Sequence, residues 1–321
     1  MNKTDTHSIL QEIGLLGIVP VIAIRDARHA RGLGGALLAG GLACAEVTFR
    51  TSAALEAIRE LTTAYPEMLV GAGTVLTTEQ AGDAKQAGAR FIVSPGLNPS
   101  VVEYCLAEGM PITPGVLTPT EVEAALGLGL QVVKFFPAEA SGGLKYLKAI
   151  SAPYTSLKFI PTGGIDRSNL LQYLRFPRTL ACGGSWMVKA DLIAEERFSD
   201  IEAITSDAVA ELLGFELQRG EGPAESKREP GRIAEELSRE FGMRVRVAEA
   251  RREAEDAAGD GPSALRGDTI VRTHFIERAL YYLLKKGIEK DGGAGLDEAG
   301  KPRAVPLNRE VAGARVWLVQ E

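Results

Sequence analysis

Short apolar runs alternate with longer mixed segments along the first two-thirds of the chain. Each run is followed by a segment rich in Ala, Leu and Glu with helical spacing. Continuous rather than alternating apolar residues are typical of strands buried on both faces, and strands that alternate with helices indicate a parallel sheet. The eight runs occupy residues 17–24 (GIVPVIAI), 45–50 (AEVTFR), 68–75 (MLVGAGTV), 91–96 (FIVSPG), 110–116 (MPITPGV), 132–138 (VVKFFPA), 157–164 (LKFIPTGG) and 179–186 (TLACGGSW).

Eight strand–helix units in roughly 200 residues match a (β/α)8 TIM barrel. A doubly wound open sheet is the structural alternative. Nearly every run ends in a chemically unusual residue, among them Lys134, Thr162 and Ser185. A barrel gathers all the strand ends around one site, whereas an open sheet spreads them along an edge. We therefore predict the α/β class and a (β/α)8 barrel, with a helix over about residues 8–16 that closes its bottom.

The pattern changes after about residue 214. The stretch 218–232 (QRGEGPAESKREPGR) is polar and contains Gly and Pro, so we predict a linker or a mobile loop. Beyond it, IAEELSREFG and HFIERALYYLLKKG predict helices, whereas GDTIVRT, PRAVPL and ARVWLVQ predict strands. We expect a barrel domain over residues 1–213 and a smaller α+β domain over residues 214–321.

The composition is that of a globular protein, with 45% hydrophobic and 24% charged residues. The formal net charge of −6 provides no basic field to attract nucleic acid. No apolar run is long enough to span a bilayer, and the N-terminus lacks the apolar core of a signal peptide, so we expect a cytoplasmic protein without a membrane partner. The three cysteines are far apart and only three histidines occur, so we predict no metal site.

Lys134 is the centre of the functional prediction. It lies within VVKFFPAEA, where its immediate neighbours are apolar. A lysine at a strand end usually extends its amine to water. On a buried barrel strand, however, desolvation favours the neutral amine, which is the form that attacks a ketone to give an imine. The protonated imine then withdraws electrons while a nearby carbon–carbon bond breaks.

Two further motifs carry polar chemistry. In AEVTFR, Glu46 and Arg50 are four residues apart, so both point to one face of a strand. One interpretation is an ion pair that only stabilises the strand. The other is that Glu46 transfers protons and Arg50 binds a carboxylate. PTGGI and GGSW follow the last two predicted strands. Their glycines allow the backbone to approach an anion, and barrels commonly bind phosphate at this place.

These motifs resemble a known family. AEVTFR, VGAGTV, SPG, PITPGV, VVKFFPAE, PTGGI and GGSW, in this order and spacing, are similar to the 2-keto-3-deoxy-6-phosphogluconate / 4-hydroxy-2-oxoglutarate aldolases. The resemblance implies a homotrimeric barrel lyase that needs no metal or cofactor and cleaves a phosphorylated keto acid of the Entner–Doudoroff pathway. The resemblance does not decide whether the substrate is the gluconate compound or its galactonate epimer. It also does not decide whether 4-hydroxy-2-oxoglutarate is cleaved.

The resemblance also implies residue roles. Lys134 would form the Schiff base, Glu46 would be the general acid and base, and Arg50 would bind the pyruvyl carboxylate. The remaining substrate-binding residues would be Thr74, Pro95 and Phe136 around the pyruvyl group, Thr162 at the hydroxyls, and Gly163, Gly164 and Ser185 at the phosphate.

The C-terminal part resembles a glyoxalase-type (vicinal oxygen chelate) βαβββ module. Active members of that fold use several His and Glu ligands, but this part contains only His274, so an interaction or regulatory role is favoured over metal chemistry. Two alternatives to an aldolase stay open for the barrel: another phosphate-binding barrel enzyme, such as an isomerase or synthase, and a sugar-phosphate sensor. Neither needs a lysine inside VVKFFP.

Overall fold

The computed structural model describes residues 3–218, 229–248, 268–297, 300–311 and 313–321. The chain divides into two compact units, Met1–Val209 and Ala210–Glu321. Each unit has its own sheet, so we describe each unit by itself.

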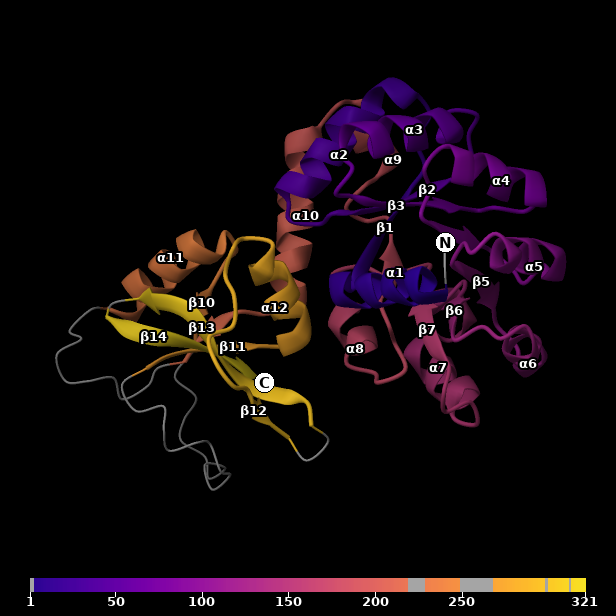
Figure 1. Ribbon diagram of the computed structural model, residues 1–321. Helices are drawn as coiled ribbons and strands as arrows, with labels where there is room; N and C mark the ends of the chain where they lie inside the picture. The colour runs from indigo at the N-terminus through magenta and orange to yellow at the C-terminus, as the bar shows by residue number, and fades with distance from the viewer. Residues whose placement is uncertain (1–2, 219–228, 249–267, 298–299, 312) are drawn as a thin grey trace. The chain divides into compact units, whose positions relative to one another are not determined.

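The first unit is the predicted barrel of parallel strands (Figure 1). Each of the eight apolar runs contains one strand, and almost every strand residue is buried, as expected for a sheet covered on both faces. The strands are β1 (Ile18–Ile22), β2 (Cys44–Thr48), β3 (Leu69–Gly73), β4 (Phe91–Ser94), β5 (Ile112–Val116), β6 (Val132–Phe135), β7 (Lys158–Pro161) and β8 (Cys182–Gly184).

The ring closes between its last two strands. β1 pairs with both β2 and β8, so the sheet order runs from β7 through β1 to β8. β7 and β8 are joined by the parallel bridges Phe159↔Thr179 and Thr162↔Gly183. The backbone N–H of Leu180 donates to Phe159 O at 2.9 Å across the same seam. These bonds exclude the open sheet that the sequence left as an alternative.

Helices follow the strands and surround the ring (Figure 1). Several begin at a capping side chain directly after a strand; Thr118 and Glu121 form a complete capping box, with Pro119 at the first helical position. The helices of this unit are α1 (Lys3–Leu16), α2 (Ala30–Ala39), α3 (Ala54–Ala64), α4 (Thr78–Gln86), α5 (Pro99–Ala107), α6 (Pro119–Gly127), α7 (Gly143–Ser151), α8 (Leu170–Leu174), α9 (Ala190–Ala194) and α10 (Phe198–Leu213), which runs on into the second unit.

Helix α1 lies at the amino ends of the strands. It buries Ile9, Ile13 and Leu16, which share one helix face. Its Glu12 carboxylate lies 3.7 Å from the guanidinium of Arg90, directly before β4, and Gly14 packs against Leu180, two residues before β8. The helix therefore covers the barrel bottom, as predicted, and leaves the carboxyl ends of the strands for chemistry.

The second unit is a mixed six-stranded sheet with the order β10-β9-β11-β14-β13-β12. β11 and β14 are parallel, whereas β14, β13 and β12 are antiparallel neighbours. The two helices bury apolar faces, and the Phe215 and Phe241 rings meet edge to face at 5.2 Å. The elements are β9 (Glu216–Leu217), α11 (Pro230–Phe241), β10 (Arg246–Val247), β11 (Thr269–Thr273), α12 (Ile276–Leu284), β12 (Gly295–Leu296), β13 (Pro302–Val311) and β14 (Ala314–Gln320).

The structure differs from two predictions in this unit. The expected linker over residues 218–232 falls mostly outside the described residues, but its end belongs to α11, which begins at Pro230. His274 lies just before the predicted helix, where a capping or solvated side chain is expected, but its ring is largely buried and bonded to the Glu321 carboxylate.

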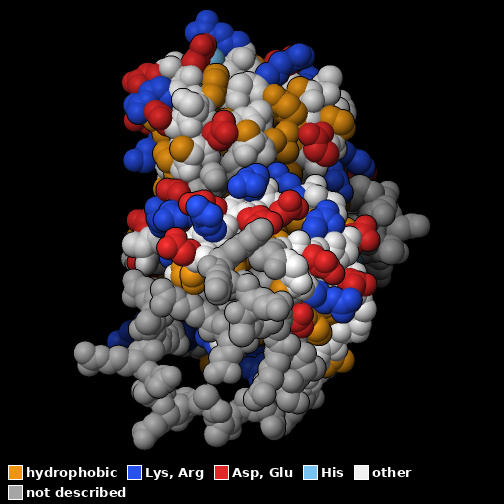
Figure 2. Space-filling model, turned by 90° about the vertical axis from the view of Figure 1, so that its left-hand side faces the viewer, with side chains coloured by type: hydrophobic (Ala, Val, Ile, Leu, Met, Phe, Trp, Pro, Cys, Tyr) orange, Lys and Arg blue, Asp and Glu red, His pale blue; other side chains and the backbone are white. Residues whose placement is uncertain are grey.

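Charged side chains of both signs are interspersed on the face of the protein shown in Figure 2. Among the described residues, no helix combines the length and the apolar composition needed to cross a membrane.

Candidate active site

A buried lysine–carboxylate pair lies inside the barrel. Lys134, on β6, has its Nζ 3.6 Å from Oε1 of Glu46, on β2. The two residues are only 5% and 3% exposed. Glu46 Oε1 makes no hydrogen bond with any residue that the structure describes. The pair thus holds an amine and a proton acceptor close together, away from bulk solvent, which is the arrangement that imine chemistry requires.

The walls around this pair need small residues. A Cβ on Gly73 would overlap the Glu46 carboxylate. A Cβ on Gly115, the Cα partner of Lys134 in β5, would overlap the carbonyl oxygen of Pro95. Glycine at these two positions lets neighbouring strands approach the pair closely. The Phe136 ring lies on the other side, with its centroid 5.0 Å from Lys134 Nζ.

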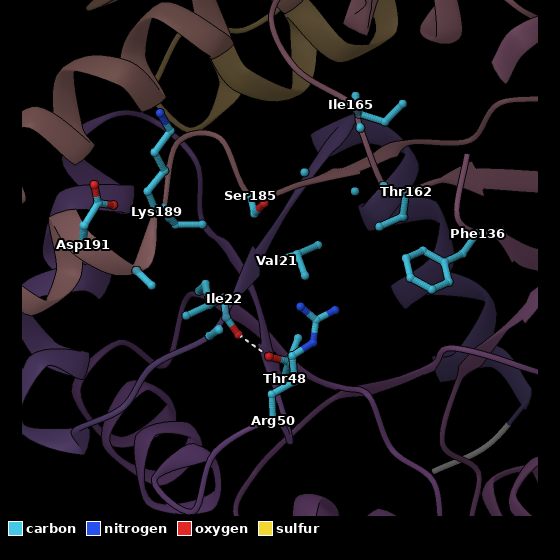
Figure 3. Close-up of a pocket in the computed structure, with 17 residues that line it drawn as sticks. Val21, Ile22, Thr48, Arg50, Phe136, Thr162, Ile165, Ser185, Lys189 and Asp191 are labelled. Carbon is cyan, nitrogen blue, oxygen red and sulfur yellow. Dashed lines mark hydrogen bonds between the residues drawn. The ribbon is translucent and has the colours of Figure 1, made fainter. Parts of the chain in front are cut away.

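A cavity of about 570 Å³ lies at the carboxyl ends of the strands (Figure 3). Neither Lys134 nor Glu46 lines it, but Phe136, which contacts Lys134, forms part of its wall. Thr48 lines this cavity, and its Oγ1 donates to Ile22 O at 2.7 Å. Residues two apart on a strand point to the same face, so Glu46 points the same way as Thr48 but lies deeper in the barrel. The cavity is large enough for a sugar acid of six carbons.

Arg50 is the cation at the inner part of this cavity. Figure 3 shows its guanidinium directed among Val21, Phe136 and Thr162. It makes no ion pair with any other described residue. A guanidinium in this state is available to bind a carboxylate with two parallel hydrogen bonds.

The structure corrects the prediction that Glu46 and Arg50 share a strand. β2 ends at Thr48, and the N–H of Arg50 donates to Thr48 O at 2.7 Å in the following turn. Alternation along a strand therefore does not apply to Arg50. The ion-pair partner of Glu46 is Lys134, so the predicted alternative of a Glu46–Arg50 ion pair is wrong.

The other predicted site residues fall into two groups. Phe136, Thr162, Gly163, Gly164 and Ser185 line the cavity together with Arg50. Thr74 and Pro95 do not line it. They follow Gly73 and Ser94, next to the buried pair, and Thr74 has the left-handed backbone angle φ of 56°, which is rare for a threonine.

Three polar cavity residues escaped the sequence analysis: Thr48, Lys189 and Asp191. Thr48 lies within AEVTFR, and its position two residues after Glu46 was a usable signal. Lys189 and Asp191 follow GGSW by a few residues: Lys189 lies at the end of the loop that carries Ser185, and Asp191 lies in the first turn of α9. In Figure 3 they lie on the far side of Ser185 from Phe136.

The second unit offers no comparable site within the described residues. No three His, Cys, Asp or Glu side chains in the part of the chain that the structure describes lie close enough together to hold a metal ion. His274, for which the sequence favoured a role other than metal binding, pairs with Glu321.

A closed barrel with a buried lysine–glutamate pair, and a cavity lined by an arginine and two successive left-handed glycines, has the features of a lysine-dependent aldolase. Residues 9–204 match the family "KDPG and KHG aldolase". The chain belongs to this family of aldolases, which are carbon–carbon lyases.

Known relatives agree with this assignment. The 2-dehydro-3-deoxy-phosphogluconate aldolase of Treponema pallidum is 48% identical over 202 residues, which are 63% of this chain and 96% of that protein. The KHG/KDPG aldolase of Escherichia coli K12 is 41% identical over 207 residues, 64% of this chain and 96% of that protein. The crystal structure of KDPG aldolase from Legionella pneumophila, with pyruvate captured as a covalent carbinolamine, has 38% identity and a TM-score of 0.60, covering 62% of this chain and 97% of that one.

The matched family region ends at residue 204, so it leaves the second unit unassigned. The predicted strand, helix and two further strands correspond to β11, α12, β13 and β14, whereas the short strand β12 was not predicted. The resemblance to a glyoxalase-type module stays a prediction.

Proposed function

We propose that this protein cleaves 2-keto-3-deoxy-6-phosphogluconate to pyruvate and glyceraldehyde 3-phosphate through an imine on Lys134. The proposal rests chiefly on one observation: the Lys134 amine lies 3.6 Å from the Glu46 carboxylate in a buried setting. The names of the relatives supply the substrate.

The reaction follows from the geometry. The Lys134 ammonium first passes a proton to Glu46; the neutral amine then attacks the C2 carbonyl, and Glu46 returns the proton with which the carbinolamine loses water. Glu46 then accepts the proton of the C4 hydroxyl while the C3–C4 bond breaks, and the bonding electrons pass into the protonated imine to give an enamine. The aldehyde leaves, C3 takes up a proton, and water hydrolyses the imine to release pyruvate.

Different residues in and around the cavity bind different parts of the substrate. Arg50 binds the carboxylate of the pyruvyl half, and Phe136, Thr74 and Pro95 shape the space around that half. Thr162 contacts the hydroxyls. The backbone N–H groups of Gly163 and Gly164, with Ser185, hold the phosphate, because left-handed glycines allow successive N–H groups to converge on an anion.

The protein also cleaves 4-hydroxy-2-oxoglutarate to pyruvate and glyoxylate in this proposal. The pyruvyl half and the C4 hydroxyl are common to the two substrates, and Lys134, Glu46 and Arg50 act only on these shared groups. The name of the Escherichia coli relative includes this activity.

Two properties accompany the proposed activity. We propose a cytoplasmic protein, since none of the three buried cysteines forms a disulfide. We propose a homo-oligomer, a trimer by resemblance to the family.

Borohydride trapping with pyruvate, followed by mass spectrometry of peptides, tests the proposal. Reduction should fix pyruvate to Lys134 alone. Lys158, at the opposite end of the neighbouring strand β7 with its Nζ 2.6 Å from Pro177 O, provides the control. Lys158→Arg should trap as the native protein does, and Lys134→Arg should not trap. Without an adduct on Lys134 the protein would be a phosphate-binding barrel of another class or a sensor.

A further inference from the structure

The loop after β6 is bonded directly to the turn that would hold the phosphate. The N–H of Ala138 donates to Thr162 O at 2.8 Å, and the N–H of Glu139 donates to Gly163 O at 3.0 Å. The backbone of Glu139 therefore lies beside the Gly163–Gly164 turn. Its side chain carries a negative charge next to a cradle for anions.

The base of the Glu139 side chain contacts the Gly163–Gly164 turn, but its carboxylate points away from that turn. A Cβ built on Gly164 would lie 2.6 Å from the Cβ of Glu139, so the base of the side chain packs against that glycine. The carboxylate lies elsewhere: its Oε1 is 3.1 Å from the corresponding position on Gly143, at the start of α7. There it accepts a hydrogen bond from the hydroxyl of Tyr173.

Tyr173 is well placed to fix this orientation. It lies on α8, the helix that follows the Gly163–Gly164 turn, and its side chain is only 1% exposed. Burial, together with the hydrogen bond to Glu139, raises the pKa of the Tyr173 hydroxyl above its ordinary value. The hydroxyl therefore keeps its proton at neutral pH and can only donate to the carboxylate.

Releasing this carboxylate would place it near the anion site. The Glu139 side chain is exposed. Among the described residues, the hydrogen bond from Tyr173 is the interaction that holds its carboxylate in place. Rotation about its side-chain bonds from a Cβ that already touches Gly164 carries the carboxylate toward the turn. Like charges a few ångströms apart at a protein surface repel strongly.

We propose that Tyr173 is a positioning residue for the phosphorylated substrate: it holds the Glu139 carboxylate away from the Gly163–Gly164 turn, so that this charge does not oppose the substrate phosphate. The inference rests on the proposed function and goes beyond it, because neither Tyr173 nor Glu139 lines the cavity. It identifies a pair of residues that sets the preference for phosphorylated over non-phosphorylated substrates.

The main test is Tyr173→Phe, which removes the hydroxyl and keeps the ring. We expect KM for 2-keto-3-deoxy-6-phosphogluconate to rise about tenfold, which is the order of the repulsion between two charges a few ångströms apart near solvent, while kcat changes less than about twofold. KM for pyruvate in the exchange of its methyl protons with solvent should not change, because pyruvate carries no phosphate. The rise should shrink at high salt, since screening weakens the repulsion.

Two further variants separate charge from packing. Glu139→Gln combined with Tyr173→Phe should restore KM to within about threefold of the native value, because no charge remains to be released. Glu139→Asp, whose carboxylate is one methylene too short to reach Tyr173, should raise KM as Tyr173→Phe does, and it leaves the buried ring untouched. Glu139→Asp therefore tests the proposal even if the Tyr173→Phe variant does not fold.

A matched control is available on the same barrel. The Tyr154 hydroxyl donates to Glu123 Oε1 at 3.1 Å on the exposed surface, so Tyr154→Phe removes the same kind of bond elsewhere. Tyr154→Phe should change neither KM for 2-keto-3-deoxy-6-phosphogluconate nor KM for pyruvate. Equal rises in KM for both reactions, or failure of Glu139→Gln to rescue, would show that the tyrosine is only structural. If the native protein neither cleaves the substrate nor exchanges pyruvate protons, the proposed function fails first, and this inference with it.

Discussion

Replacing Glu46 with glutamine tests the buried pair most directly. Glutamine has nearly the same shape but cannot accept a proton from a substrate hydroxyl. General acid–base groups contribute about 10²–10⁴ in rate, or about 3–5 kcal/mol of activation free energy. We therefore expect cleavage of 2-keto-3-deoxy-6-phosphogluconate to slow by about that factor, and borohydride trapping and pyruvate proton exchange to slow with it.

The same substitution should lower stability by an amount that the structure sets. At 3.6 Å and an effective dielectric constant of about 20, the Coulomb attraction between unit charges is about 5 kcal/mol. Both side chains are almost fully buried, so salt screens this attraction little. Removing one partner of a buried pair costs about 3–5 kcal/mol, because the other charge is left uncompensated.

The double variant Glu46→Gln/Lys134→Met separates the two effects. It should recover much of the lost free energy of unfolding, measured with urea, because no unpaired charge remains, but it should have no activity. Glu60→Gln provides the control, since its pair with Arg31 is exposed and should contribute little to the free energy of unfolding. Full cleavage activity in Glu46→Gln, with reduced stability, would refute the reasoning and leave Glu46 a purely structural partner of Lys134.

Four further outcomes are expected. Lys134→Arg should lose all but a trace of cleavage activity, because a guanidinium does not form the imine; clear turnover in a steady-state assay would contradict the mechanism. Ser185→Ala should weaken cleavage of the phosphorylated substrate more than that of 4-hydroxy-2-oxoglutarate, and equal losses in kcat/KM would make the serine structural. Extensive chelation should leave the rate unchanged, since the protonated imine is the electron sink; loss of activity that a divalent ion restores would point to a metal-dependent aldolase. Deleting residues 215–321 should leave cleavage intact, because the curated relatives match over the barrel alone; a soluble, folded truncation with unchanged assembly but no activity would give the second unit a direct role.

The sequence predicted the barrel well because each strand is buried on both faces. A run such as residues 68–75 is continuously apolar and small, and it contains β3 at Leu69–Gly73. Prediction was weaker wherever a contact depends on another strand or loop. Arg50 lies in a turn because β2 ends at Thr48, and no local pattern indicates that end. Leu284, predicted on the apolar face of α12, is 57% exposed, whereas Tyr282 is buried in the same helix.

The Glu139–Tyr173 pair shows a different limit. Both residues were visible in the sequence, Glu139 at the end of VVKFFPAE, but neither was predicted to interact. The hydrogen bond joins the loop after β6 to the helix after β7, 34 positions apart. Side-chain pairs of this kind depend on how two loops pack, which periodicity does not encode.

The Lys134–Glu46 contact depends on the closure of the sheet into a barrel. β2 and β6 are separated by four steps in the sheet order. Neighbouring strands lie about 4.8 Å apart, so in an open sheet these two strands would be roughly 19 Å from each other. Two side chains cannot reach 3.6 Å across that distance along an open sheet, whereas in a ring of eight the same two strands face each other across the interior. The chemistry therefore requires closure, and only long side chains such as lysine and glutamate can meet across the ring. This is why residues 88 positions apart in the chain can form one site, and why interrupting the seam between β7 and β8 should separate the pair before it unfolds the individual strands.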